Sequence, residues 1–403
     1  MRTLFLAFLL GCACALAPGQ GAGRGDFELV ESTPVETILD NPDVRNTQEV
    51  WLEMIRGAKR SLDIEEFYIS NQAGEPLDTI IGAVRAAGRR GVAVRVIVDS
   101  RMYKTYPETA DLLGKTENIR MRVIDFGTIA GGVQHAKYFI VDTAEVFLGS
   151  QNFDWRSLKH IHELGVRIRH PEAARLYRDV FDLDWSLAAG GRSGTPLDSR
   201  RYRVPFRAAG SAGDTITFTP TVSPSGLIPD STLWDETQIV GLIDGARSEV
   251  ECQFLTYSPL ARGKTYYAEL DNALRRAAAR GVKVRIVVSD WSKDHPAVDY
   301  LKSLACVPNV EVKFSSIPDW SGGYVPFARV EHCKYLVIDS SRCWIGTANW
   351  ERSYFYNTRN VGVRVEQGSF TRLLRRIFFK GWDGPYTETI RPETDYRPRR
   401  HGE

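Results

Sequence analysis

Gly91-Val-Ala-Val-Arg-Val-Ile-Val-Asp99 is a largely apolar run, and it returns as Gly281-Val-Lys-Val-Arg-Ile-Val-Val-Ser289. In both copies an Ala- and Arg-rich helical stretch comes before the glycine. Another helix and strand come before that stretch, at 51–68 and at 239–257. Val- and Ile-rich runs that alternate with helices are typical of buried parallel strands in βαβ units. The repeat therefore predicts two domains of the same α/β fold.

Composition sets the limits of these domains. The chain has 403 residues, of which 43% are hydrophobic and 25% charged, and this excludes disordered, collagen-like and coiled-coil classes. Residues 188–225 are rich in Gly, Ser, Pro and Arg without a clear period, which predicts a linker. Residues 26–187 then form the first domain and residues 226–395 the second. The net charge of +2 neither indicates nor excludes a nucleic-acid partner.

The N-terminus has the pattern of a secretory signal peptide over residues 1–17. A basic residue precedes an apolar stretch from Leu4 to Leu16, which is shorter than the roughly 20 residues of a membrane span. We therefore expect export, to the cell exterior, an endolysosomal lumen or a periplasm. The alternative is a lipid anchor at Cys12, because the sequence around it loosely resembles a bacterial lipobox.

Four cysteines follow that segment, all in the second half: Cys252, Cys306, Cys333 and Cys343. An exported protein can form disulfides in an oxidising compartment, and four thiols allow three connectivities. The sequence does not choose among these connectivities, so the pairing stays open.

Each half carries one polar motif at the same spacing. The first copy consists of His135, Lys137, Asp142, Ser150 and Asn152, and the second of His332, Lys334, Asp339, Thr347 and Asn349. Residues two apart on a strand point to one face, so each His lies beside its Lys. The Gly-Ser or Gly-Thr pair turns the chain and returns the Asn to the same edge. Two copies at equivalent places predict a functional cluster at a cleft.

Two copies of His, Lys and Asn suit the chemistry of a phosphodiester. Cationic and amide donors stabilise the charge on the non-bridging oxygens of phosphate in the transition state. One neutral His attacks phosphorus and forms a covalent phosphohistidine, while the other protonates the leaving oxygen and then activates water or an alcohol. This reaction requires no metal and no cofactor. His160, His162 and His170 show no metal-ligand spacing with a Cys or carboxylate partner, so we expect surface or supporting roles for them.

The paired motif resembles the signature of the phospholipase D superfamily, over nearly the whole chain after the signal peptide. The resemblance implies two phospholipase D-like α/β/α sandwich domains around a pseudo-two-fold axis, with the active site at their interface. It also implies a metal-independent phosphodiesterase that works through a covalent phosphohistidine. The catalytic residues that we expect are His135, Lys137, Asp142, Asn152, Glu163, His332, Lys334, Asp339 and Asn349, with Ser150 and Thr347 as substrate-binding residues.

Two segments narrow the resemblance to the animal lysosomal branch of the superfamily. They are Leu148-Gly-Ser-Gln-Asn-Phe-Asp-Trp-Arg-Ser-Leu158 and Val325-Pro-Phe-Ala-Arg-Val330. Proteins of that branch act as five-prime exonucleases on single-stranded DNA and RNA, and poxvirus envelope proteins share its motifs. The expected substrate is therefore single-stranded nucleic acid, and the sequence leaves room for a homodimer. Asp339 departs from the branch, which usually has Glu at this position.

In this superfamily a polar side chain downstream of one motif orients the imidazole of the other, and the matching positions are Glu163 and Asn360. A carboxylate behind an imidazole stabilises the cation that forms on attack. Glu163 would thus favour His332 as the nucleophile and His135 as the acid and base. Other members of the superfamily assign the first histidine, so both assignments stay open.

Aromatic residues near the motifs are candidates for stacking on nucleobases. Tyr324 and Phe327 precede the second motif, with Trp320 close by, and we expect them to bind substrate. Trp155 and Trp350 follow the two motif Asn residues in matched positions, where packing in the core is the commoner role.

Two other functional classes compete with a nuclease. The same catalytic atoms serve a phospholipase D or transphosphatidylase that acts on phospholipid head groups, and the motifs do not distinguish the cleft walls of the two. A binding or envelope-type protein that kept the fold without the chemistry is the third class. The intact His, Lys and Asn in both halves speak against it.

Overall fold

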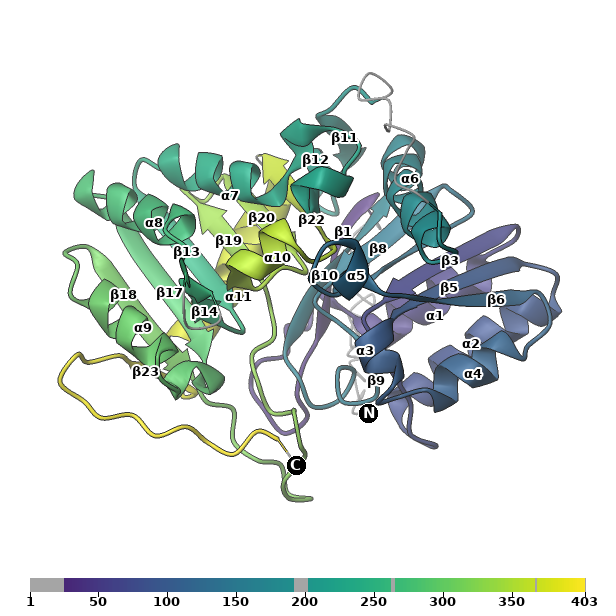
Figure 1. The fold of residues 1–403 in the computed structure, drawn as a ribbon. Coiled ribbons are helices and arrows are strands. Elements are labelled where there is room, and N and C mark those ends of the chain that lie inside the picture. Colours follow the sequence, from purple (N-terminus) through teal and green to yellow (C-terminus); the bar gives the residue numbers. More distant parts are fainter. Residues whose placement is uncertain (1–24, 192–201, 262–264, 367, 403) are drawn as a thin grey trace, which may run out of the picture.

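The computed structural model describes residues 25–191, 202–261, 265–366 and 368–402. The signal peptide predicted at 1–17, with the alternative lipid anchor at Cys12, lies outside these residues. Two large β-sheets, one from each half of the chain, form the framework of the molecule (Figure 1).

The first sheet has the strand order β2-β1-β10-β8-β7-β3-β5-β6. In chain order its strands are β1 (Phe27–Ser32), β2 (Arg45–Asn46), β3 (Ser61–Glu66), β5 (Ala93–Asp99), β6 (Ile119–Ile124), β7 (Tyr138–Val141), β8 (Glu145–Gly149) and β10 (Glu163–Arg169). β3, β5 and β6 are parallel neighbours, as the βαβ pattern predicts, and β7, β8 and β10 are antiparallel to one another. A short parallel pair, β4 (Ile69–Ser70) and β9 (Phe153–Asp154), lies outside this sheet.

The second sheet has the strand order β11-β12-β22-β20-β19-β13-β17-β18-β23. Its strands are β11 (Phe206–Ala209), β12 (Thr215–Ser223), β13 (Glu249–Phe254), β17 (Lys283–Ser289), β18 (Val310–Ser315), β19 (Tyr335–Ile338), β20 (Arg342–Gly346), β22 (Asn360–Glu366) and β23 (Thr387–Thr389). Two small pairs lie apart from it: β14 (Tyr257–Ser258) with β21 (Trp350–Glu351), and β15 (Leu260–Ala261) with β16 (Thr265–Tyr266).

The two sheets repeat one topology, which confirms the duplicated α/β fold. The order β1-β10-β8-β7-β3-β5-β6 in the first sheet corresponds to β12-β22-β20-β19-β13-β17-β18 in the second. The linker predicted at 188–225 is wrong for its second part, because residues 206–223 form β11 and β12 and pair with β22. Ile216 and Phe218 alternate with polar residues and are buried, but Pro220 and the Thr-rich composition resemble a loop.

Helices form three layers around the sheets. The helices are α1 (Thr47–Gly57), α2 (Pro76–Arg89), α3 (Ser100–Tyr103), α4 (Glu108–Gly114), α5 (Phe126–Ile129), α6 (Pro171–Leu187), α7 (Asp235–Asp244), α8 (Glu269–Ala279), α9 (Ala297–Ala305), α10 (Arg352–Tyr356) and α11 (Ser369–Trp382). α1, α2 and α4 pack on the outer face of the first sheet, and α7, α8 and α9 on that of the second. α6 and α11 pack between the sheets, where one apolar core includes Tyr177, Val166, Val363 and Phe378. The two domains therefore share their central layer.

Local sequence explains where the principal helices begin. α1 starts after Asn46, whose side chain accepts a hydrogen bond from the backbone N–H of Gln48. α2 starts at Pro76, whose fixed φ suits the first helical turn and whose missing N–H has no partner to lose. The apolar side chains of α2 recur at helical spacing, with Leu77, Ile80 and Val84 fully buried.

The described residues contain no helix that is long and apolar enough to cross a membrane. The four cysteines of the second half are free thiols, so none of the disulfide pairings left open by the sequence forms among them. Cys252, Cys333 and Cys343 are buried, and Cys306 is exposed.

Candidate active site

Each His-Lys motif lies in an extended segment directly before a central strand. His135 and Lys137 precede β7, and His332 and Lys334 precede β19. β7 and β19 occupy equivalent positions in the two sheets. The two motifs therefore lie at equivalent ends of the two sheets.

Backbone hydrogen bonds join these segments across the domain boundary. The N–H of His135 donates to the carbonyl of Arg359 at 3.0 Å, and the N–H of His332 donates to the carbonyl of His162 at 2.9 Å. Arg359 and His162 each donate back, at 3.0 Å, to the carbonyl two residues before the histidine. Each motif is thus paired with the start of the other domain's β22 or β10. This arrangement brings the two halves of the site together.

The two lysines are fully buried beside their histidines. Nζ of Lys137 donates to the carbonyl of His135 at 2.6 Å, and Nζ of Lys334 donates to the carbonyl of His332 at 2.5 Å. The residue between each pair faces the apolar core, as the alternation predicts. Each ammonium group is therefore held by the backbone of its own motif through a carbonyl acceptor.

The two histidines have different supporting side chains. Nδ1 of His332 is hydrogen-bonded to a carboxylate oxygen of Glu163, which also accepts from the Ser157 hydroxyl. Nδ1 of His135 lies 3.1 Å from Oδ1 of Asn360. Each support comes from the other domain. The structure thus places Glu163 and Asn360 behind the imidazoles as the sequence predicts, with a carboxylate behind one ring and an amide behind the other.

Burial decides the protonation of the histidines. Burial and the Lys137 and Lys334 ammonium groups hold the pKa of His135 well below its usual range. The same three effects lower the pKa of His332. A histidine whose pKa is lowered is neutral near pH 7, and a neutral imidazole is a competent nucleophile or general base.

Burial also shifts the groups around the histidines. It lowers the pKa of Lys334 to about 7. Burial lowers the pKa of Lys137 well below its usual range as well, and Lys334 adds to this effect. Burial raises the pKa of Glu163 to about 8, against the opposing effect of the Ser157 hydroxyl. An anionic phosphate would reverse the lysine shifts, because it supplies the charge that the ammonium groups lack.

Both histidines line one cavity of about 260 Å³. Asn152 and Asn349 also line it, and their buried Oδ1 atoms have no hydrogen-bond partner in the described part of the chain. The remaining wall includes six aromatic residues and one cation: Phe67, Tyr68, Tyr106, Trp291, Phe327, Tyr354 and Arg156. The His and Asn side chains of both motifs thus converge on a single concave site, which is the arrangement that the two-histidine chemistry requires.

Ser150 and Thr347, which were predicted to bind substrate, are not among the residues that line the catalytic cavity. Both are fully buried. The hydroxyl of Ser150 accepts a hydrogen bond from the N–H of Leu164 at 3.2 Å, and the hydroxyl of Thr347 donates to Oδ1 of Asn360 at 2.9 Å. These hydroxyl groups fix the strands that carry Glu163 and Asn360, because they bond to the chain at or beside those residues.

Asp142 and Asp339 were predicted to be catalytic, and the structure places them elsewhere. Each follows the far end of its strand, about 16 Å along the chain from the motif Lys at roughly 3.3 Å per residue. The carboxylate of Asp142 accepts from the backbone N–H groups of residues 59–61 at 2.7–3.3 Å. That of Asp339 accepts from residues 247–249 at 2.8–3.2 Å. These residues fix the start of β3 and β13.

The aromatic residues that were predicted to stack on substrate lie in different places. Phe327 lines the catalytic cavity, whereas the hydroxyl of Tyr324 donates to the carbonyl of Gly402 at the outer surface. Trp350 is buried in the core of the second domain, and Trp155 packs against the core of the first. Trp320 packs against the ring of His160. Of these aromatic residues, only Phe327 is placed to touch a substrate in the cavity.

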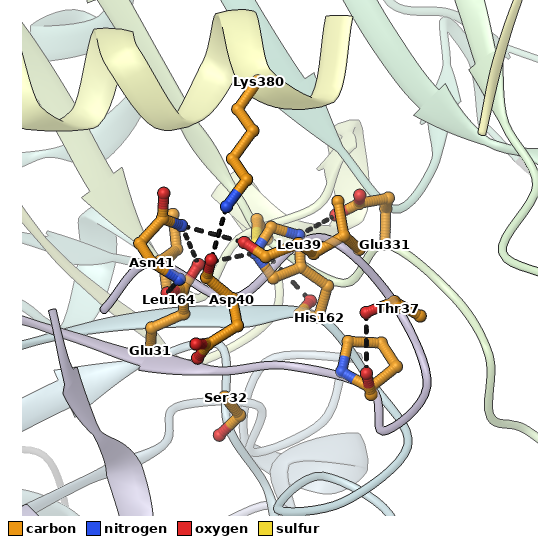
Figure 2. Close-up of polar contacts among 12 residues, drawn as sticks. Glu31, Ser32, Thr37, Leu39, Asp40, Asn41, His162, Leu164, Glu331 and Lys380 are labelled. Carbon is orange, nitrogen blue, oxygen red and sulfur yellow. Dashed lines mark hydrogen bonds and ion pairs between the residues drawn. The ribbon is translucent and has the colours of Figure 1, made fainter. Parts of the chain in front are cut away.

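Of the surface or supporting roles expected for His162, the structure excludes the surface, because the ring is buried between two carboxylates (Figure 2). Its partners, Glu331 and Glu31, come from distant parts of the chain, so sequence spacing could not reveal them. His170 caps the start of α6 by accepting from the N–H of Ala173 at 3.2 Å. His160 packs between two tryptophan rings.

The sequence analysis missed three residues that line the cavity beside His135. Phe67 and Tyr68 directly follow β3, and Tyr354 packs edge-on against His135 with ring centroids 4.9 Å apart. Their position in the sequence could have revealed them, because Phe67 and Tyr68 end the first repeated helix-and-strand segment. That end of the strand carries the site. Tyr354 occupies the position in the second half that Ser157 has in the first.

Asp142→Ala and Asp339→Ala should each lower the free energy of unfolding by about 1–2 kcal/mol, because three backbone N–H groups lose their acceptor. The turnover number should stay within about twofold of the wild type. Backbone donors lower the pKa of Asp339 to about 2, although burial opposes them, so its contribution is complete above pH 4 and disappears toward pH 2. Urea unfolding at several pH values and steady-state kinetics measure both effects. Loss of turnover without loss of stability would restore the catalytic assignment.

The catalytic efficiency on a phosphodiester should fall above about pH 7, because Lys334 then loses its proton. An arginine at position 334 stays charged at all accessible pH values. In the Lys334→Arg variant the fall in kcat/KM at high pH should therefore begin at least one pH unit higher than in the wild type, even though the variant is slower. The measurement is kcat/KM from pH 4 to 9 for both proteins. Basic limbs at the same pH in the two proteins would rule out Lys334 as the titrating group.

Comparison with known proteins agrees with this geometry. The family described as cardiolipin synthase, PLD-like domain, matches residues 51–185 and 239–382. The chain is 30% identical to Phospholipase D Z of Dictyostelium discoideum, with 96% of this chain and 98% of that protein covered. It is 31% identical to 5'-3' exonuclease PLD3 of Bos taurus, with 91% and 81% covered.

Solved structures share the fold at low identity. A phosphatidylserine synthase from Haemophilus influenzae matches with a TM-score of 0.60 and 15% identity over 85% of both chains. A polyphosphate kinase from Porphyromonas gingivalis matches 99% of this chain and 55% of its own length, with a TM-score of 0.55 and 14% identity. The two matched domains and the paired motifs lead to one conclusion: the chain belongs to the phospholipase D superfamily and is a phosphodiesterase with two phospholipase D-like domains.

Proposed function

We propose that the protein is a metal-independent exonuclease that degrades single-stranded DNA and RNA from the five-prime end. The observation that carries this proposal is the aromatic wall of the catalytic cavity. Phe67 lies 5.0 Å from the ring of His135, and Tyr68 stacks on Tyr106 at 5.2 Å. Aromatic rings beside a phosphate-binding centre provide faces on which nucleobases stack. The exported state predicted from residues 1–17 belongs to the same proposal.

A second cavity extends the site. It measures about 470 Å³ and shares Phe67 and Tyr354 with the catalytic cavity. Arg101 and Arg352 line it. A polymer substrate has further phosphates on one side of the cleaved bond, and guanidinium groups are suited to bind them. A phospholipid head group offers no such series of phosphates, so this cavity favours nucleic acid.

The proposed reaction has two steps. Nε2 of neutral His332 attacks phosphorus and forms an N–P bond, while the P–O bond to the leaving nucleoside breaks and protonated His135 donates its proton to that oxygen. His135 takes up that proton when the anionic phosphate binds, because the phosphate opposes the two ammonium groups that lower its pKa in the free protein. His135 then takes a proton from water, whose oxygen forms a P–O bond as the N–P bond breaks. Lys137 and Lys334 stabilise the phosphate oxygens in both steps. We assign the attack to His332 because the Glu163 carboxylate stabilises the cation that forms on its ring.

The alternative is a phospholipase D or transphosphatidylase that acts on phospholipid head groups. The observation that favours it is the name of the Dictyostelium relative, which covers nearly the full length of both chains. This alternative uses the same catalytic residues, so only the substrate distinguishes the two functions.

Substrate assays in the presence of EDTA test the proposal. We expect shortening of a single-stranded oligonucleotide that carries a five-prime hydroxyl, and no cleavage of the same sequence as a circle, which has no end. Phosphatidylcholine vesicles should release no choline. Choline release with an intact oligonucleotide would favour the lipase, whereas cleavage of the circle would show endonuclease action. His135→Ala and His332→Ala, the matched inactive controls, should each abolish the cleavage.

A burst experiment identifies the nucleophile. The p-nitrophenyl ester of thymidine phosphate has a leaving group that needs no protonation, so attack does not require the acid. His135→Asn should therefore release one equivalent of nitrophenolate per site and then stall, because no base activates water. His332→Asn should show no burst. Rapid mixing with absorbance detection measures the amplitude, and the reverse pattern would assign the nucleophile to His135.

A further inference from the structure

Figure 2 shows a buried charge cluster that the two reaction steps do not use directly. Its centre is His162, which precedes Glu163. Nδ1 of His162 lies 2.5 Å from a carboxylate oxygen of Glu331, and Nε2 lies 3.1 Å from one of Glu31. All three side chains are buried. A carboxylate only accepts hydrogen bonds, so two such partners fit a ring that carries a proton on both nitrogens.

The other half of the chain has a permanent cation at the same position. Residues 152–163 align with residues 349–360 without a gap, so Arg359 is the counterpart of His162. Arg359 is fully buried and donates to both oxygens of Asp184, at 2.6 and 2.7 Å. Each of these residues directly precedes the side chain that supports a catalytic histidine.

The charges around the two positions also match. Arg359 binds Asp184 and interacts electrostatically with Glu65, so it faces two carboxyl groups. His162 likewise faces two glutamate side chains. Each of the two equivalent positions thus faces two carboxyl groups, although Glu31, on β1, and Asp184, on α6, come from different elements.

A neutral partner completes the match. Nε2 of Gln253, on β13, donates to Glu331 at 2.7 Å. In the first half the roles are exchanged, because Nε2 of Gln134 donates to Glu65, on β3, at 3.2 Å. Each cluster therefore contains one Glu and one Gln at equivalent positions. The Glu and the Gln exchange places between the two halves, so each cluster keeps one carboxyl group at this pair of positions.

The surroundings of His162 favour its charged form. Burial alone would lower the pKa of His162, but the carboxylates of Glu331 and Glu31 outweigh it and raise the pKa to about 10. His160, two residues earlier, has no carboxylate hydrogen-bonded to its ring, and burial lowers its pKa to about 4. His160 is therefore the natural neutral control.

The cluster is joined directly to the catalytic pair. Glu331 precedes His332, and His162 precedes Glu163, so the contact between Glu331 and His162 lies beside the hydrogen bond between His332 and Glu163. Glu31, on β1, accepts two hydrogen bonds from Asn41, at 2.7 and 3.1 Å. Figure 2 also shows Lys380, from α11 of the second domain, donating to the carbonyl of Asp40.

We propose that His162 is a positioning residue for the proposed phosphodiesterase reaction, on which this inference rests. As an imidazolium between Glu31 and Glu331, it holds Glu163 against His332 across the domain boundary. Arg359 does the same for Asn360 and His135. His162 touches neither substrate nor the reacting atoms, and it acts through the orientation of the His332 ring.

A metal ion is the competing occupant, because Cys333 brings a sulfur close to His162 and Glu331. The distances favour a proton. A tetrahedral zinc ion with nitrogen and oxygen ligands at about 2.0–2.2 Å keeps those ligands more than about 3 Å apart. The 2.5 Å between the His162 nitrogen and the Glu331 oxygen leaves no space for it. The Sγ of Cys333 also donates to the carbonyl of His162, at 3.4 Å.

Substitution of His162 tests the proposal through rate and not through stability alone. His162→Gln should lower the turnover number on the nitrophenyl ester by about 10- to 100-fold with KM within about threefold of the wild type. The burst amplitude counts folded sites, so turnover is expressed per competent site. His162→Arg and His162→Lys restore the charge and should recover most of the rate. His160→Gln, the matched control, should turn over like the wild type.

A second measurement observes the charge itself and does not depend on activity. Nitrogen-15 NMR of the wild type at pH 8, with the His162 signals assigned by their loss in His162→Lys, should show both ring nitrogens protonated. A neutral ring at pH 8, wild-type turnover per site in His162→Gln, or loss of wild-type turnover in EDTA would each overturn the proposal. Absence of wild-type activity on every phosphodiester would instead contradict the proposed function, while the NMR result would still report the charge.

Discussion

Two reciprocal pairs of backbone hydrogen bonds across the domain boundary determine the geometry of this active site. Each catalytic histidine donates its own N–H to the residue that precedes its support in the other domain. The separation between imidazole and support is therefore set by main chain, which is stiffer than two independent side chains. Neither half can build a complete site, because His135 depends on Asn360 and His332 depends on Glu163. The apolar core shared through α6 and α11 keeps the two sheets in the relation that these bonds require.

Burial of the site affects the charges of its lysines and histidines. Lys137 and Lys334 are buried together, and each ammonium group donates a hydrogen bond to a backbone carbonyl. Nearby carboxyl groups, Glu163 among them, favour the charged lysines but do not outweigh burial, so the site is less stable until an anion enters. A phosphodiester brings the missing charge, and its binding free energy then offsets the cost of burial. The same burial keeps both histidines neutral before the substrate binds, and the attacking ring must be neutral.

The sequence was sufficient for the duplicated α/β fold and the paired His, Lys and Asn residues, because these depend on strand periodicity and on a spacing that occurs twice. The two supports came from the resemblance to the phospholipase D superfamily. The sequence was insufficient where a role depends on three-dimensional neighbours. Asp142 belongs to the motif in sequence but binds backbone N–H groups at the far end of its strand. The hydroxyl of Ser150 accepts a hydrogen bond from the backbone N–H of Leu164 on β10. β12 was missed since Pro220 and its threonines resemble a loop, although its alternation carries the strand signal.

Duplication also explains how a symmetrical framework supports an asymmetrical reaction. The two motifs offer the same His and Asn to one cavity, so they cannot by themselves decide which ring attacks phosphorus. The difference between the two rings must come from positions where the backbones of the two halves are equivalent but the residue types differ. Glu163 and Asn360 are such a pair, and each is hydrogen-bonded to a catalytic ring. A cation on the His332 ring favours the ionised form of Glu163, which burial otherwise opposes. The carboxylate then stabilises that cation more than an amide does, so in the proposed mechanism the attacking ring is the one that faces Glu163. The equal spacing of the two halves preserves the geometry, and in this proposal the residue type at the support determines which histidine is the nucleophile.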